Sequence, residues 1–396
     1  MKLVVVGFGQ CGGRVADEFS RLNARARSRR RIEIVADTFA VNTDVADLSS
    51  LSSIKSDYQH RILIGTRKTG SHGVGKVNEV GAEIARHDGD KIIDAVRSVE
   101  RFYEADAFLL VAGAAGGTGS GSMPVMAQTI RERYGDKPVY ALAILPFDHE
   151  ETTEARTIHN SATCLKATYS VADAVFLVDN QRYVKKDSSL ANNMTAINQL
   201  IVEPFYDVLC AGEETKRRHI GARLLDAGDI IQTLGGWTAL GYGKSQVSLV
   251  RLSSERARDF RKKSIETHKG IQAMDQALSN ISLGCNPMDS GSALYLLSAP
   301  NREMNMDLVK ELGDYLKDVA PEATIRYGDY PRGGSTLKIT VILSQLKYVE
   351  KVLEYYTDLA DLIQKRESQQ EDVEAKLKAL ADASTAVPSL LESGNP

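Results

Sequence analysis

Long hydrophobic runs are missing from this sequence. No stretch of about 18 or more apolar residues occurs, and a helix that crosses a bilayer needs roughly 20. The first ten residues, MKLVVVGFGQ, also lack the apolar segment and cleavage site of a signal peptide. We therefore expect no transmembrane segment and a cytoplasmic protein, with a cortical position in the cell left open.

Cysteine is scarce as well. The four cysteines among 396 residues are Cys11, Cys164, Cys210 and Cys285. None of their spacings matches that of a metal site, so we predict no metal-ligating residues and free thiols in a reducing cytoplasm.

The chain has almost no excess of charge of either sign. Lys and Arg total 49 against 52 for Asp and Glu, a net charge of −3, which gives no argument for binding to nucleic acid or to membranes. One local excess follows the first predicted helix and consists of Arg21, Arg25, Arg27, Arg29, Arg30 and Arg31. We interpret it as a solvated helix end, favoured by the negative end of the helix dipole. Contact with a polyanion, a lipid surface or a partner is the alternative.

What is present is an alternation of short apolar runs and helical patterns over the first 180 residues or so. The runs that predict buried strands are Lys2–Val6, Arg61–Ile64, Ala107–Val111, Tyr140–Leu145 and Ala174–Val178. Continuous apolar runs indicate that both sheet faces are covered, as in a parallel α/β sheet. Helices are predicted between them at Val74–Arg86, Asp90–Glu104 and Met123–Tyr134. This is a doubly wound nucleotide-binding layout.

The second half of the chain follows a different pattern. A long helical stretch runs from Leu190 to about Cys210, and a smaller α+β unit comes after it. The predicted strands of that unit are Ala293–Ser298, Thr324–Tyr327 and Thr336–Leu343, and its predicted helices are Glu255–Leu278 and Met306–Val319. A length of 396 residues suits more than one domain. We predict a nucleotide-binding domain over residues 1–188, a central helix and connector over 189–223, a C-terminal domain over 224–365, and a helical, then disordered, tail over 366–396.

The first strand ends in a glycine-rich turn, Gly7-Phe-Gly9-Gln10-Cys11-Gly12-Gly13-Arg14. Gly7, Gly9 and Gly12 satisfy G-x-G-x-x-G between a strand and a helix, which is the pattern of NAD-binding Rossmann proteins. Glycine lets the backbone approach a phosphate, and a helix N-terminus supplies free N–H groups. The turn therefore predicts a bound phosphate and leaves the nucleotide open.

A second glycine-rich segment nearly matches the P-loop. Gly70-Ser-His-Gly-Val-Gly75-Lys76-Val77 has the G-x-x-x-x-G-K spacing, but Val77 stands where a hydroxyl would bind Mg²⁺. The segment also starts about five residues beyond its strand. We therefore predict a loop that closes over phosphates through backbone contacts rather than a P-loop.

The third glycine cluster carries most of the argument. It spans Gly113–Ser122 (GAAGGTGSGS), follows a buried strand and opens a helix, a place where a flexible linker would not be expected. Its N–H groups, with the hydroxyls of Thr118, Ser120 and Ser122, form an anion-binding nest that suits several phosphates. A dinucleotide enzyme needs one such loop, and this chain has three.

These segments resemble the tubulin/FtsZ family. GAAGGTGSGS is similar to the family signature GGGTGTG, with Ala114 and Ala115 as departures, and Gly9–Gly12 is similar to the GQCG of eukaryotic tubulins. Asn42-Thr43-Asp44 resembles the FtsZ motif that follows the second strand. The order of the segments also matches, up to about residue 365, and the pattern is most similar to that of the archaeal CetZ branch.

The resemblance implies GTP or GDP, with Mg²⁺, as the ligand. It also implies which residues surround the nucleotide's phosphates. They are Gly9, Gln10, Cys11, Gly12, Gly13, Arg14, Asn42, Asp44, Gly73, Gly116, Gly117, Thr118, Gly119 and Ser120.

Sugar and base contacts are implied in the same way. The segment Pro146–Glu150 resembles the FtsZ segment PF-x-F-E, which gives Glu150 the ribose; a capping role at a helix start is the alternative. Asn180 matches the tubulin DN after the sixth strand. Asn198 resembles the asparagine that reads guanine, since an amide offers both a donor and an acceptor. Met194 replaces the aromatic residue that stacks on the base in relatives.

An acidic pair follows the central helix in LLDAGDII, residues 224–231. FtsZ relatives carry N-x-D-x-x-D here, so Asp226 and Asp229 match the catalytic carboxylates and Leu224 replaces the asparagine. The resemblance implies that this pair enters the nucleotide site of the next subunit in a head-to-tail filament and orients water for attack on the γ-phosphate. The residues alone leave a capped helix start as the alternative.

The combined prediction is an assembling GTPase that controls cell shape. The tail VPSLLESGNP does not resemble the adaptor-binding peptide of FtsZ, which favours a shape role over a division ring. The alternatives are an FtsZ-type division GTPase, a non-catalytic co-assembly regulator and an NAD-binding oxidoreductase. Expected partners are further copies of the chain, with cell-envelope or membrane-associated adaptors left open, and no nucleic acid.

Overall fold

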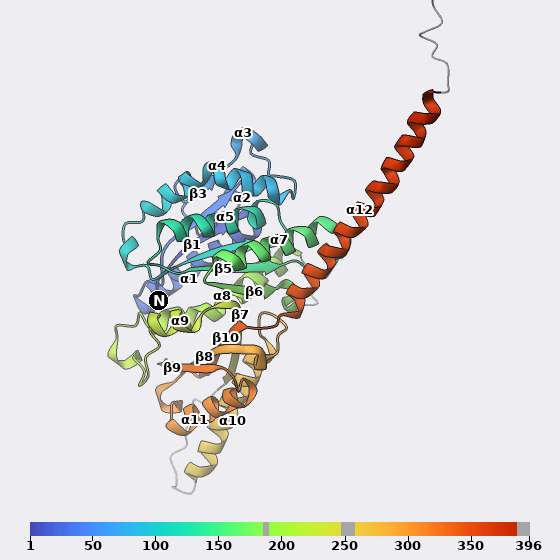
Figure 1. Ribbon diagram of the computed structural model, residues 1–396. Coiled ribbons are helices and arrows are strands. Elements are labelled where there is room, and N and C mark those ends of the chain that lie inside the picture. The colour runs from blue at the N-terminus through green and yellow to red at the C-terminus, as the bar shows by residue number, and fades with distance from the viewer. Residues whose placement is uncertain (185–189, 247–257, 386–396) are drawn as a thin grey trace, which may run out of the picture.

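One ten-stranded sheet runs through the whole protein in the computed structural model (Figure 1). The structure describes residues 1–184, 190–246 and 258–385. The strand order is β3-β2-β1-β4-β5-β6-β7-β10-β8-β9. All pairs from β3 to β7 are parallel, whereas β10 runs antiparallel to both β7 and β8.

The parallel half of the sheet has helices on both faces, as the apolar runs predict. Its strands are β1 (Leu3–Phe8), β2 (Val35–Asn42), β3 (Arg61–Leu63), β4 (Ala107–Gly113), β5 (Val139–Leu145) and β6 (Ala174–Asp179). Alternate residues of β1 belong to different cores: Val4 and Val6 to one, Leu3 and Val5 to the other. The doubly wound fold is therefore confirmed.

Seven helices connect these strands in the described part of the chain. They are α1 (Gly9–Arg30), α2 (Val45–Ser49), α3 (Thr66–Thr69), α4 (Asn78–Arg97), α5 (Thr118–Arg133), α6 (Asp148–Thr153) and α7 (Ala155–Val171). The prediction of two helices, Val74–Arg86 and Asp90–Glu104, is wrong because α4 is continuous. Gly73, Gly75 and Lys76 have positive φ angles of 81°, 56° and 60°, which keeps the segment before α4 out of a helix. Gly89 lies inside α4 and close to α5, since a Cβ there would lie 3.3 Å from the sulfur of Met126.

The arginine cluster was misplaced relative to the first helix. α1 extends to Arg30, so Arg21–Arg30 lie within the helix and only Arg31 lies at its end, in the left-handed conformation with φ 62°. Arg27, Arg29 and Arg30 occupy the last turn, where the dipole favours cations.

The second half of the chain continues the same sheet. Its elements are α8 (Leu190–Ala211), α9 (Ala227–Thr233), β7 (Gly236–Gln246), α10 (Arg258–Ser279), β8 (Ser290–Ala299), α11 (Met306–Val319), β9 (Thr324–Pro331), β10 (Thr336–Leu346) and α12 (Glu350–Thr385). β2 and β7 were not predicted. Residues 255–257 of one predicted helix, the start of the predicted central segment and the end of the predicted tail from 386 onward lie outside the described residues.

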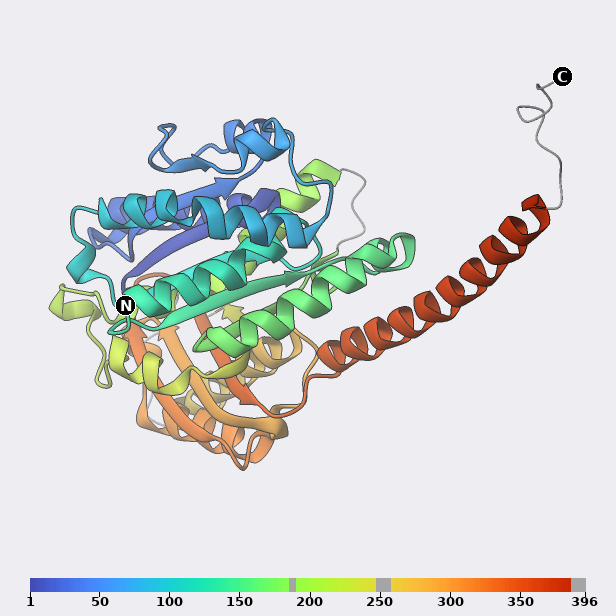
Figure 2. The ribbon, with the colours of Figure 1, turned by 45° about the horizontal axis from the view of Figure 1, so that its top comes forward.

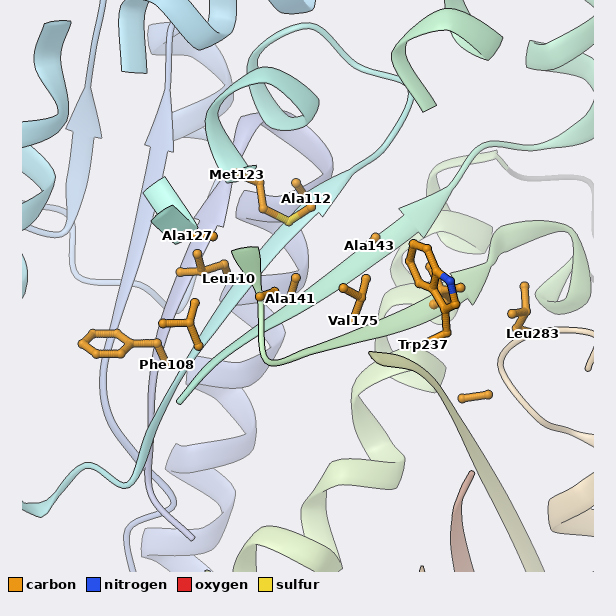
Figure 3. Packing of buried hydrophobic residues seen from close by; sticks show 14 of the residues in the cluster. Phe108, Leu110, Ala112, Met123, Ala127, Ala141, Ala143, Val175, Trp237 and Leu283 are labelled. Atoms are coloured by element: carbon orange, nitrogen blue, oxygen red, sulfur yellow. The ribbon is translucent and has the colours of Figure 1, made fainter. Parts of the chain in front are cut away.

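Strand β7 joins the two halves. Its first residues, Gly236–Thr238, pair with β6 in parallel, and Ala239–Gln246 pair with β10 in antiparallel register. The apolar core follows the same route. Figure 3 shows it passing from Phe108 and Leu110 of β4 past Val175 of β6 to Trp237 of β7. The two halves therefore share a core.

Helix α12 leaves the body of the protein. Its first turns pack against α7, and its later turns project away in both views (Figures 1 and 2). Within the described residues, every helix is too short or too polar to cross a bilayer.

A buried polar network ties α1 and α8 to the C-terminal strands. The guanidinium of Arg30 donates to Asp207 of α8 at 2.6 Å and to the hydroxyl of Tyr330 in β9 at 2.9 Å. Asp207 also pairs with Lys338 of β10 at 3.4 Å, and the Tyr330 hydroxyl donates to Glu214 at 3.0 Å. Arg30 and Asp207 are about 6% and 5% exposed, so each neutralises a charge that water cannot reach.

We expect Gly12→Ala to destabilise the protein by about 1–3 kcal/mol, the usual cost of overpacking. A Cβ at Gly12 would lie 2.1 Å from the carbonyl oxygen of Val111, so α1 or β4 must move. Gly13→Ala is the matched control, because its Cβ would meet only Ala40 and Leu51 at 3.8 Å or more. Denaturant unfolding of both variants measures the difference, and equal stabilities would contradict the close helix–strand contact.

Candidate functional site

The candidate site is a hollow of about 350 Å³ at the carboxyl edge of the parallel strands. Segments that follow β1, β2, β4, β5 and β6 all line it. In a doubly wound sheet this edge is where ligands bind, because the loops that leave successive strands meet there. The lining combines glycines and small side chains with larger ones, among them Phe8, Lys76, Phe147 and Met194.

The loop between β4 and α5 forms the floor of the hollow. Gly116, Gly117 and Thr118 lie at the N-terminus of α5, whose free N–H groups favour an anion. Gly9, with φ 68°, comes so close that a Cβ there would lie 2.9 Å from the amide nitrogen of Gly119. The first and third glycine clusters thus meet, and two helix N-termini converge on one space.

The loop over residues 73–77 closes one side of the hollow. The Gly73 amide donates to the Thr43 carbonyl at 3.2 Å. The side-chain amide of Asn160 in α7 donates to the carbonyl oxygens of Lys76 and Ala115 at 2.9 Å each, which joins this loop to the β4–α5 loop. The Lys76 ammonium pairs with Glu154 at 2.6 Å. A P-loop lysine would instead point at phosphate. Lys76 also lines the hollow, and the backbone role of this loop stays a prediction.

Polar side chains after β2 form another wall. Asp47 accepts hydrogen bonds from Gln10 at 2.7 Å and from Asn42 at 3.0 Å. Asp44 caps α2 by accepting from the amides of Ala46 and Asp47. Thr43 bonds to the Thr118 hydroxyl at 2.6 Å, which fixes this wall to the floor. Sequence reasoning missed Asp47, although its position three residues after Asp44, in the first turn of a helix, was a usable signal.

Apolar and polar side chains together line the opposite end of the hollow. It is lined by Cys11, Phe147, Glu150, Asn180 and Met194. One carboxylate oxygen of Glu150 accepts from the Phe147 amide at 2.9 Å, so Glu150 does cap α6, as the alternative predicted. Burial, and then the charge of Glu150, raise the pKa of the Cys11 thiol to about 12, so this thiol is neutral near pH 7.

The structure gathers most of the predicted residues around this hollow. Those that line it are Gly9, Gln10, Cys11, Asn42, Asp44, Gly73, Gly116, Gly117, Thr118, Gly119, Glu150, Asn180 and Met194. Further lining residues are Phe8, Val74, Ile144 and Phe147, which were not chosen as site residues, although all but Ile144 lie within the motif segments singled out in the sequence.

Five of the residues predicted to contact the nucleotide lie outside this lining. Gly12 packs against β4, and Gly13 faces Ala40 and Leu51. Ser120 is buried behind the floor, where its hydroxyl donates to the Gly116 carbonyl. Arg14 and Asn198 line an adjacent hollow of about 570 Å³, which shares Met194 with the first.

The acidic pair lies at the other edge of the sheet. Asp226 is the N-cap of α9 and accepts from the Asp229 amide at 2.9 Å, as the capping alternative predicted. A Cβ at Gly212 would lie 3.4 Å from the Asp226 Cα and 3.5 Å from the amino group of Met1, which precedes β1. The hollow, by contrast, begins at the far end of β1. α8, with 22 residues, spans about 33 Å between the Met194 end and this edge. Asp226 therefore cannot reach the hollow of its own chain.

Asp229 has a cationic neighbour. Its carboxylate lies 3.8 Å from the Arg326 guanidinium of β9, which also donates to Gln232 at 2.8 Å. The Asp229 side chain is 41% exposed, and Asp226 is exposed as well. Both carboxylates are therefore open to contact from outside the chain.

Fold and site together define a class of protein. A doubly wound sheet with converging glycine loops at its carboxyl edge is a phosphate-binding nucleotide site, here joined through a long helix to a second α+β unit. The exposed acidic pair at the opposite edge is a feature that a Rossmann oxidoreductase does not need.

Comparisons with known proteins give the family. Residues 2–186 match the Tubulin/FtsZ family, GTPase domain, and residues 187–360 match the Tubulin-like CetZ, C-terminal domain. Tubulin-like protein CetZ1 of Haloferax volcanii is 33% identical over 87% of each chain. The chain belongs to the tubulin-like CetZ family, and its N-terminal half is a tubulin/FtsZ-type GTPase domain.

Solved structures agree with this membership. CetZ1 from Haloferax volcanii, a GDP-bound monomer, has a TM-score of 0.78 and 30% identity, over 91% of this chain and 99% of that one. CetZ2 from the same organism, a GTPγS-bound protofilament, has a TM-score of 0.78 and 30% identity, over 93% of this chain and 100% of that one. An FtsZ of M. jannaschii, at 20% identity and 0.65, shares the fold, over 87% of this chain and 88% of that one.

Proposed function

We propose that this protein binds GTP in the hollow, assembles head to tail into filaments and hydrolyses GTP at the contact between subunits, in the control of cell shape. The observation that carries the proposal is the separation of two halves of an active site. A phosphate-binding hollow lies at one edge of the sheet, and two exposed carboxylates, Asp226 and Asp229, lie at the other.

The phosphates are assigned to the floor of the hollow. N–H groups at the start of α5 and the turn at Gly9 would hold them, and the Thr118 hydroxyl adds a polar contact. Sugar and base are assigned to the other end, with Glu150 at the ribose and Asn180 at the base. Asn198 would reach the base only from the adjacent hollow, so its assignment rests on the family resemblance.

Mg²⁺ would join the nucleotide at the phosphate end. This ion keeps several waters and takes one or two carboxylates besides phosphate oxygens, and no cluster of three or more His, Cys, Asp or Glu suited to a metal occurs in the described residues. Asp44 and Asp47 are the carboxylates that line this end of the hollow, so they fit such a partial shell. The ion would neutralise charge on the phosphates, and the chain itself orients them.

Hydrolysis is assigned to the contact between two subunits. In a head-to-tail filament the edge with Asp226 and Asp229 faces the hollow of the next copy, and the carboxylates would orient a water for attack in line with the departing phosphate. A heterologous contact of this kind that does not close on itself gives an open filament. The solved CetZ2 protofilament supports such assembly. The proposal extends to a cortical location, with cell-envelope adaptors as further partners.

The test is GTP hydrolysis per subunit measured over a hundredfold range of protein concentration, with sedimentation in parallel. We expect the rate per subunit to rise with concentration and to level off where most of the protein sediments. A rate per subunit that stays constant would show a site complete in one chain and would overturn the proposal. GTP binding and sedimentation without hydrolysis would instead point to a non-catalytic co-assembly protein.

A further inference from the structure

The first turns of α12 contact α6, on the outer side of the wall assigned to sugar and base. The Lys351 ammonium lies 3.0 Å from a carboxylate oxygen of Glu151 and 3.9 Å from one of Asp148, both in α6. The hydroxyl of Tyr355, one turn further along α12, donates to the other oxygen of Glu151. Tyr355 is 2% exposed, and the Lys351 and Glu151 side chains are 21% and 17% exposed. This contact is thus largely shielded from water.

The two segments that the charge of Lys351 acts on, α6 by direct contact and the end of β6 through its electrostatic effect on Asp179, are the ones that carry lining residues. Glu150 lies in α6 between Asp148 and Glu151, and it faces the hollow while Glu151 faces α12. The second segment is the end of β6, where Asp179 directly precedes Asn180. Burial raises the pKa of Asp179, and Lys351 is close enough to oppose that shift.

The charge balance at this contact depends on Lys351. Burial disfavours its ammonium form, yet its pKa is raised because Glu151, Asp179 and Glu354 favour that form more strongly. Without this cation, Glu151, whose side chain is 17% exposed, and the partly buried Asp179 would lose a compensating charge, with the more exposed Asp148 as a third negative charge nearby, and like charges repel. The expected relief is a shift of α6 away from β6, which would move Glu150.

We propose that Lys351 and Tyr355 are positioning residues for the nucleotide, so that the base of α12 sets the shape of the sugar-and-base wall. The inference rests on the proposed function for its ligand, and it adds a coupling between the projecting C-terminal helix and the hollow. Neither side chain lines the hollow, so both act through α6 and the end of β6.

The first test compares Lys351→Met, Lys351→Arg and the control Lys347→Met in GTP and GDP affinity at pH 7.5. Lys347 is an exposed lysine just before α12, so its replacement makes the same change of charge outside the contact. We expect Lys351→Met to raise both dissociation constants about tenfold, because sugar and base are common to the two nucleotides. Lys351→Arg and Lys347→Met should stay within about twofold of wild type. A Lys351→Met protein with wild-type affinities would overturn the proposal.

A pH series separates charge from packing. The groups that face Lys351 or its partners are Asp148 and Glu151 of α6, Asp179 of β6, Arg182 after β6, and Glu354 and Tyr355 of α12. Burial raises the pKa of Asp179, so this carboxylate takes up its proton at a higher pH than an ordinary aspartate, whereas Tyr355, whose pKa is also raised, keeps its proton over the whole series. The defect of Lys351→Met relative to Lys347→Met should therefore shrink as the pH falls from 7.5 to 5. A defect that is the same at both values would show lost packing and contradict a role for the charge.

A readout without nucleotide keeps this inference apart from the proposed function. Cys11 lines the same wall and is close enough to Glu150 for the carboxylate to raise its pKa. Loosening of α6 should speed alkylation of Cys11 several-fold in Lys351→Met, with Cys285 as the internal control in the same peptide digest. Tyr355→Phe, which removes only the hydroxyl, should also speed alkylation of Cys11, by a smaller factor than Lys351→Met. Unchanged Cys11 reactivity in both variants overturns the coupling, whether or not the wild-type protein binds GTP.

Discussion

Asp226→Asn is expected to reduce GTP hydrolysis by about 10²–10⁴-fold, the usual contribution of a group that positions or activates water. GTP affinity should not change, because Asp226 lies at the opposite edge of the sheet from the hollow. Asparagine is preferred over alanine because it can still accept from the Asp229 amide and cap α9, whereas alanine would also lose about 1 kcal/mol of capping. Steady-state phosphate release and a fluorescent-nucleotide titration measure the two quantities.

Mixing experiments show whether the carboxylate of one subunit acts on the nucleotide bound to another subunit. A second variant, Thr118→Val, should weaken GTP binding while leaving the Asp226 edge intact. In a head-to-tail filament, Asp226→Asn subunits supply sound hollows and Thr118→Val subunits supply sound carboxylates. A mixture of the two should therefore hydrolyse GTP faster than either alone. If the mixture only averages the two rates, Asp226 acts within its own chain or not at all.

The second large effect is expected from Asp207→Ala, which should lower the free energy of unfolding by about 3–5 kcal/mol. Alanine leaves the Arg30 guanidinium buried without its carboxylate partner at 2.6 Å, and Lys338 loses a partner too. Since these groups come from α1, α8 and β10, the loss should affect the joint between the two halves of the protein. Denaturant unfolding, followed by circular dichroism, measures it.

The matched control for Asp207→Ala is Glu33→Ala. Glu33 pairs with Arg27 of α1 at 2.9 Å and with Arg101 at 3.2 Å, but these arginine side chains are 56% and 53% exposed, and exposed pairs contribute about 0–1 kcal/mol. Equal losses in the two variants would mean that the Arg30 network is not the charged joint we describe. The double variant Arg30→Met with Asp207→Leu should recover much of the stability, because it leaves no buried charge unpaired.

The sequence predicted those parts of the fold in which hydrophobicity alone decides the structure. β4 and β5 are apolar runs and β6 is apolar up to Asp179, with both faces covered, and α11 was predicted with the bounds that the structure has. β2 was missed because its run is interrupted by Asp37 and Thr38, which are partly or fully covered by other elements. β7 was missed because glycines break its apolar pattern. Gly241 and Gly243 are required there, since a Cβ at either would lie about 2 Å from a carbonyl of α10.

The phosphate-binding part of the site was predictable, because the spacing of its glycines indicates the backbone conformation of the loops. The turn at Gly9 and the loop at Gly116–Gly119 could be placed at one edge of the sheet because both follow parallel strands. The contacts that hold this site together were not predictable. Asn160 joins the 73–77 loop to the floor from a helix far along the chain, and Lys351 reaches α6 from about 200 residues away. Such pairings depend on tertiary structure and leave no local pattern.

The length of α8 has a consequence for the ends of a filament. Because α8, about 33 Å long, runs between the edge that holds the hollow and the edge that holds the acidic pair, every internal nucleotide would meet the carboxylates of a neighbour. The last subunit at one end has no such neighbour, so its GTP would survive until another copy arrives. A filament of this protein would therefore always have one tip that keeps its triphosphate. The age of that tip, rather than of the filament, would decide when shortening can begin there.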